Sequence, residues 1–159
     1  MDVQREGEDE FALWAMIIQS RDIIFHARDK ELSQYGITAV EARALYILNR
    51  VGDRATPAMI SREMVRGHNT VTALFSRMEN KGLIEKERDP YKKNSWLISL
   101  TKKGKKAYAN SLKREMIKDV FSVIPNADLI KMTAYLEEVM ERASKYLSEN
   151  GTHVPKIFP

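Results

Sequence analysis

Residues 56–100 constrain the fold most, because two short helical patterns are followed directly by two short extended ones. Thr56 and Pro57 supply an N-cap hydroxyl and then a proline, which is a typical helix start. After a break at Gly67, a second helix carries apolar residues at spacings of three, one and three, and Gly82 ends it. Helix, turn, helix and then a two-stranded hairpin is the element order of a winged helix–turn–helix.

The second of these helices has one apolar face and one small, polar face. The apolar face comprises Val71, Leu74, Phe75 and Met78. The opposite face comprises Asn69, Thr70, Thr72, Ala73, Ser76, Arg77 and Asn80. An α-helix fits the major groove of DNA, and Asn, Thr, Ser and Arg side chains can bind base edges or phosphates there. The pattern therefore favours a DNA-reading helix, with an ordinary solvated face as the alternative.

The two extended segments, 83–88 and 95–100, flank a turn-forming and basic loop at 89–94. This pattern predicts a β-hairpin with a charged tip, which could reach the neighbouring DNA backbone or minor groove. A lysine-containing turn with no binding role is the alternative.

The net charge of +4 is unevenly distributed along the chain. The segment 54–106 has 13 basic and five acidic residues, which gives +8, whereas the remainder has 13 basic and 17 acidic residues, which gives −4. A basic middle between acidic flanks indicates a polyanion-binding module held by a separate scaffold. A solvated charged surface would give the same bias.

The flanking regions read as helices with surplus apolar surface. The pattern predicts one helix over 8–34 with two apolar stripes, a helix from Thr38 to Gly52, a long helix capped by Thr101 and extending past Val120, and a last helix over about 126–150. In the last helix, apolar residues step by three and four, as in a coiled coil. Together with the apolar residues of the tail, 153–159, this surplus predicts packing against a partner chain.

Several function classes are excluded or disfavoured. The chain has no Cys, which excludes disulfides, thiolate metal sites and a cysteine nucleophile. No apolar run is long enough to span a membrane, and the acidic start, 1–10, resembles neither a signal nor a transit peptide. His26, His68 and His153 are scattered. We therefore expect a mostly helical intracellular protein that is not an enzyme and needs neither a cofactor nor a metal.

The residues around the hairpin resemble the MarR (multiple antibiotic resistance regulator) family. The similarity lies in 80–86, Asp89-Pro90 and 97–104, with support from 35–38 and 56–64, and it extends over roughly 10–150. It implies a mainly α fold with a small β-hairpin wing, in which 38–100 form a winged helix–turn–helix. The segments 8–34 and 101–159 would form a helical dimerisation region. The implied protein is a cytoplasmic, homodimeric transcription regulator that acts as a repressor.

The resemblance also implies which residues contact DNA. These are Asn69, Thr70, Thr72, Ala73, Ser76 and Arg77 on the helix, Lys92, Lys93 and Asn94 on the wing, and Arg62 and Arg66 at or after the short helix. An ordinary surface role is the alternative for Arg62 and Arg66, and Arg77 could instead hold the wing or a phosphate. His68 is a further candidate at the helix start, with a solvated cap as the alternative. The wing departs from the family, which usually carries Asp-x-Arg where this chain has Lys92-Lys93-Asn94. Lysine supplies charge without the planar fork of arginine, so we expect phosphate contact at the wing tip.

The resemblance implies three partners. They are a double-stranded, pseudo-palindromic operator, a second copy of the chain, and a small aromatic effector that releases the DNA. Candidate effector-pocket residues are Trp14, His26, Arg43 and Tyr46, with the core or the dimer interface as the alternative, and favoured, place for Trp14. The competing hypothesis is a winged helix used for protein–protein assembly without specific DNA binding, which would not need the +8 segment.

Overall fold

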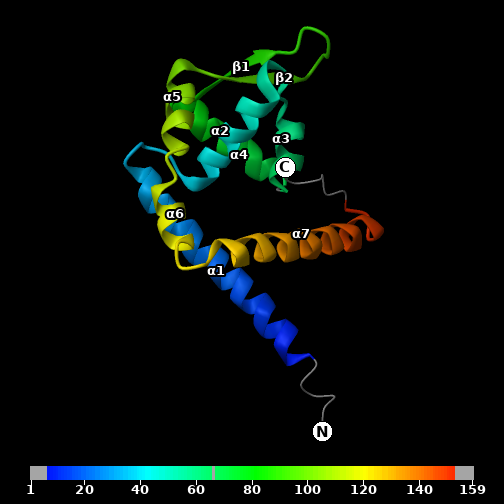
Figure 1. The fold of residues 1–159 in the computed structure, drawn as a ribbon. Helices are drawn as coiled ribbons and strands as arrows, with labels where there is room; N and C mark the ends of the chain where they lie inside the picture. Colours follow the sequence, from blue (N-terminus) through cyan, green and yellow to red (C-terminus); the bar gives the residue numbers. More distant parts are fainter. Residues whose placement is uncertain (1–6, 66, 153–159) are drawn as a thin grey trace. The chain divides into compact units, whose positions relative to one another are not determined.

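The computed structural model describes residues 7–65 and 67–152, and the side chain of His68 is not among the described parts. The chain divides into two compact units, Met1–Ala39 and Val40–Pro159. The elements, labelled in Figure 1, are α1 (Glu8–Ser33), α2 (Ala39–Val51), the 3₁₀ turn η1 (Gly52–Arg54), α3 (Pro57–Met64), α4 (His68–Asn80), β1 (Ile84–Arg88), β2 (Trp96–Leu100), α5 (Lys102–Ser111), α6 (Glu115–Phe121) and α7 (Asn126–Glu149).

The winged helix–turn–helix is confirmed, and it has its own hydrophobic core. The apolar residues of α2, α3, α4 and the hairpin that lie in this core include Leu45, Leu48, Ile60, Met64, Leu74, Phe75, Met78, Ile84 and Ile98. The strands β1 and β2 are antiparallel, with Ile84 opposite Leu100 and Arg88 opposite Trp96. On the other edge of β2, the Ile98 amide donates to the Ala55 carbonyl over 2.9 Å. The hairpin is therefore attached through β2 to the segment between η1 and α3.

The end of α4 is fixed by a compact set of contacts. Gly82 has φ +68°, and the Gly82 and Leu83 amides donate to the Glu79 and Met78 carbonyls over 2.8 and 2.9 Å. This is the Schellman arrangement that ends many helices. The start of α5 presses on the same turn, since a Cβ at Gly104 would lie 2.0 Å from the Leu83 carbonyl oxygen. The direction in which the hairpin leaves α4 is thus set by close packing.

The prediction of one long helix after Thr101 is wrong. The Thr101 hydroxyl does cap α5, accepting from the Gly104 amide over 3.0 Å. The helix, however, ends at Ser111, and Arg114 has φ +53° before α6 begins. A left-handed residue interrupts the helical hydrogen bonds, so two short helices replace one.

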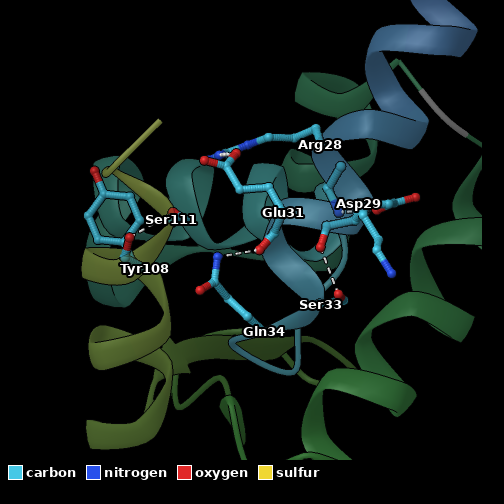
Figure 2. Close-up of polar contacts among 9 residues, drawn as sticks. Arg28, Asp29, Glu31, Ser33, Gln34, Tyr108 and Ser111 are labelled. Carbon is cyan, nitrogen blue, oxygen red and sulfur yellow. Dashed lines mark hydrogen bonds and ion pairs between the residues drawn. The ribbon is translucent and has the colours of Figure 1, made fainter. Parts of the chain in front are cut away.

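The long helices α1 and α7 bury little of their apolar surface in the single chain. Leu32 is the one residue of α1 classed as buried, and α7 has none. Local polar contacts fasten the last turns of α1: Arg28 pairs with Glu31, and the Gln34 amide donates to the Glu31 carbonyl over 2.9 Å, as Figure 2 shows. Of the residues in the two predicted stripes of α1, Phe11, Leu13, Trp14, Met16 and Ile18 are exposed.

Over residues 7–65 and 67–152, no helix combines the length and apolar character that crossing a membrane requires. Within the same ranges, no three His, Cys, Asp or Glu side chains gather as a metal site would need. The apolar tail at 153–159 lies outside the described residues, as do residues 1–6.

Candidate nucleic-acid interface

Helix α4 has the two faces that its sequence predicts. Val71, Leu74, Phe75 and Met78 are each at most 2% exposed. The six candidate DNA contacts of this helix are all exposed: Asn69, Thr70, Thr72, Ala73, Ser76 and Arg77. Among them the Ser76 hydroxyl donates to the Thr72 carbonyl over 3.1 Å, which leaves its oxygen lone pairs able to accept. The helix is therefore anchored along one side and presents small, polar groups along the other.

The turn before α4 holds an unfavourable backbone conformation. The Thr56 hydroxyl caps α3 at the Met59 amide as predicted, but α3 ends at Met64, and Val65 adopts φ +51° and ψ +49°. A β-branched residue in this left-handed region is a rare and costly conformation. Gly67 is the N-cap of α4 and supplies no side-chain cap. The first amides of α4 thus donate no hydrogen bond to a capping side chain.

Of the two arginine candidates near this turn, the structure describes Arg62 only. Arg62 is exposed on α3, and its Nε donates to the Ala58 carbonyl over 3.4 Å. Arg66 lies outside the described residues, so its candidacy stays a sequence prediction.

The wing loop is closed by backbone and side-chain hydrogen bonds. The Asp89 amide donates to the Ser95 carbonyl over 3.0 Å, and the Asp89 carboxylate accepts from the Tyr91 amide over 2.9 Å. Lys92, Lys93 and Asn94 are exposed as expected, and Asn94 has φ +70°. Asparagine tolerates this conformation better than most residues, so the geometry of the turn is sufficient to explain why an asparagine stands at position 94. In Figure 1 the loop projects beyond α2, α3 and α4.

The basic residues of the module divide into neutralised and unneutralised cations. Lys81 Nζ lies 2.9 Å from the carboxylate of Glu41, which is buried, and Lys86 Nζ lies 2.6 Å from Glu79. In the described parts of the chain, no ion pair is recorded for Arg77, Lys92 or Lys93. Three of the predicted DNA contacts are thus among the cations left without an acidic partner.

Sequence reasoning missed two pairs in this module. One is the Glu41–Lys81 pair, which ties α2 to the end of α4; Glu41 looks like a member of a capping box in the sequence. The other is Arg88, whose guanidinium lies 4.1 Å from the centre of the Trp96 ring. The strand alternation could have placed Arg88 and Lys86 on one face, but only the pairing register places Arg88 opposite Trp96.

The candidate effector-pocket residues fall in both units. Trp14 and His26 are exposed on α1, with Trp14 next to Phe11 at a ring-centre distance of 5.4 Å. On α2, Arg43 donates to the Glu63 carbonyl of α3 over 3.4 Å, and the Arg50 guanidinium lies 6.0 Å from the Tyr46 ring. Arg43 and Tyr46 therefore take part in contacts within the winged helix.

An anchored helix with a polar outer face, beside a basic hairpin, defines a winged-helix module of the kind that binds DNA. In a comparison with known protein families, residues 35–93 match the sequence model of the MarR family. The resemblance to this family noted in the sequence is therefore confirmed over these residues. No sequence among the curated proteins matches this chain.

Solved structures show the same fold over most of the chain. The ligand-bound form of the organohalide-sensing regulator RdhR-CbdbA1625 is 24% identical, with a TM-score of 0.84, over 94% of this chain and 90% of that one. A mutant MarR from E. coli complexed with operator DNA is 20% identical, with a TM-score of 0.73, over 87% and 99%. The S. aureus MepR–DNA complex is 25% identical, with a TM-score of 0.71, over 82% and 96%.

Proposed function

We propose that this chain is a sequence-specific, double-stranded DNA-binding transcription regulator in the cytoplasm. The proposal rests on the two faces of α4. Its apolar face is buried, and its other face exposes Asn69, Thr70, Thr72, Ser76 and Arg77. These groups can bind base edges, while Lys92 and Lys93 on the wing bind phosphates. Structures of similar fold are complexes with DNA, which supports this assignment.

The proposed regulator is a homodimer, in which 38–100 bind DNA and 8–34 with 101–159 form the dimerisation region. The support is the apolar surface left exposed on α7 and α1, which includes Leu136, Val139 and Trp14. A two-fold dimer would present two α4 helices to successive major grooves about 34 Å apart, and would bind a pseudo-palindromic operator. It would repress by occupying a site that polymerase needs.

Selection of bound sequences from a random duplex pool tests this function and supplies the operator. With that operator, Thr72→Asp and Arg77→Ala should each lower affinity at least about tenfold while leaving a folded dimer. The matched control is Glu137→Ala, an exposed change on α7. Unchanged affinity in both α4 variants would assign the winged helix to protein assembly instead, as would binding weaker than about 10⁻⁴ M at low salt.

A small aromatic effector is the proposed release signal. The support is the RdhR-CbdbA1625 regulator of similar fold, which is described in a 2,4-dichlorophenol-bound form. An effector acts only if it binds the DNA-free arrangement more tightly than the DNA-bound one. Titration of the protein–operator complex with 2,4-dichlorophenol should then lower operator affinity. Binding of the phenol without any change in operator affinity would contradict release by this class of ligand.

A further inference from the structure

The two faces of the wing carry opposite charge. Along β1, residues alternate between faces, so Ile84, Lys86 and Arg88 share one face. Glu85 and Glu87 share the other. On that second face Glu87 lines a shallow hollow with Asp53, Leu97 and Ser99, which adds a further carboxylate. Because the acidic face repels phosphates, a duplex should approach the strands of the wing from the face of Arg88 rather than from the acidic face.

Arg88 lies on the core side of the hairpin, just beyond the end of the core. Ile84 and Ile98 are buried on this face at the base of the hairpin, whereas Arg88 and Trp96 are exposed nearer the loop. The Asp89–Ser95 hydrogen bond that closes the loop follows immediately. Arg88 therefore lies at the hydrogen-bonded end of β1, just before the loop that contains Lys92 and Lys93.

Trp96 orients the guanidinium of Arg88. The separation of 4.1 Å is the shortest of the three cation–ring contacts in the described chain, the others being 5.5 and 6.0 Å. A ring at this distance occupies one side of the guanidinium, and a planar guanidinium carries five N–H donors, so donors remain for another partner. Across the described ranges, no hydrogen bond or ion pair to another residue is recorded for Arg88. Its donors are available to a bound anion.

We propose that Arg88, stacked on Trp96, is the wing's arginine contact to the DNA backbone. Arg88 binds a phosphate with its planar fork, and Trp96 is a positioning residue that holds the fork in place. This assignment rests on the proposed DNA-binding function. It adds a guanidinium to a wing whose tip carries lysines, and it places that guanidinium on the strand before the loop.

The test measures the affinity of the full-length protein for its selected operator across a range of salt concentrations. Arg88→Ala should lower affinity at least about tenfold. It should also reduce the slope of log affinity against log salt by about 0.9 for each bound chain. Arg88→Lys should keep the slope but lose affinity, because the charge remains and the fork does not. Trp96→Ala should also keep the slope and lose about two- to fivefold in affinity, and Trp96→Phe should restore most of that loss.

Lys86→Ala is the matched control. It removes one positive charge from the same strand and face, but from a side chain already paired with Glu79. Equal slope changes in Lys86→Ala and Arg88→Ala would overturn the proposal, since only overall charge would then matter. So would an unchanged slope in Arg88→Ala. If the unsubstituted protein binds no duplex, the proposed function itself fails, and that outcome is distinct from these.

Discussion

Helices α4 and α7 both carry an apolar stripe, yet only that of α4 is covered within the chain. The four apolar residues of α4 are at most 2% exposed, whereas Leu136, Val139 and Ile130 of α7 are 42%, 51% and 72% exposed. The short helix is covered by α3 and the hairpin, and the long one has no residue classed as buried. Similar spacing of apolar residues therefore predicts that a stripe is buried, but it does not say which surface covers the stripe. In α4 the cover comes from the same chain, and in α7 we propose a second copy.

The largest expected effect is on the free energy of unfolding. Its dependence on protein concentration should differ between variants of α4 and of α7. Phe75→Ala should destabilise the winged helix by about 3–5 kcal/mol, because it leaves a cavity in a closed core. Tyr135→Ala on α7, where the side chain is 67% exposed, should lose stability only as far as the dimer depends on it. Urea unfolding at several protein concentrations checks both. A loss below about 1 kcal/mol for Phe75→Ala would contradict a closed core around α4.

The next test addresses the cover on α7 directly. Val139→Lys should convert the dimer into monomers, because burial of an unpaired ammonium in an apolar interface is unfavourable. Operator affinity should then fall at least about 100-fold, since two linked half-site contacts become one. Glu141→Lys places the same side chain on the opposite side of α7 and should leave the dimer intact. Sedimentation equilibrium distinguishes the two, and a dimeric Val139→Lys protein would refute the proposed interface.

A smaller effect is expected at the pair that joins α2 to the end of α4. Glu41→Gln should cost about 1–2 kcal/mol, because Lys81 is partly exposed and can be hydrated instead. Lys81→Gln should cost more, since the carboxylate of Glu41 is buried and loses its cationic partner. Thermal unfolding of both variants and of the double variant checks this order. Equal losses in the two single variants would show that the difference in burial has no energetic consequence.

The sequence predicts α4 and the hairpin well because both are short and strictly periodic. In α4 the four-residue apolar stripe determines which face is buried, and Gly82 marks where the helix ends. In the hairpin, two strands of five residues each allow one buried face. It does not predict the break at Arg114, because no Gly or Pro marks that position and the apolar period continues past it. Nor does it predict contacts that depend on tertiary register, such as Glu41 with Lys81 or Arg88 with Trp96. The DNA-contacting role of each α4 residue stays a prediction.

The smallest expected effect concerns the turn that leads into α4, and its sign is informative. Val65→Gly should stabilise the protein by about 1 kcal/mol, because glycine adopts φ +51° without the strain that a β-branched residue carries there. The control is Val123→Gly at an exposed position without positive φ, where the added freedom of the unfolded chain should cost about 0.5–1 kcal/mol. If the two variants change the free energy of unfolding with opposite signs in thermal unfolding experiments, the backbone at Val65, just before α4, is strained. Two losses of equal size would instead show that the left-handed turn carries no such strain, and would leave packing alone to account for the stability of α4.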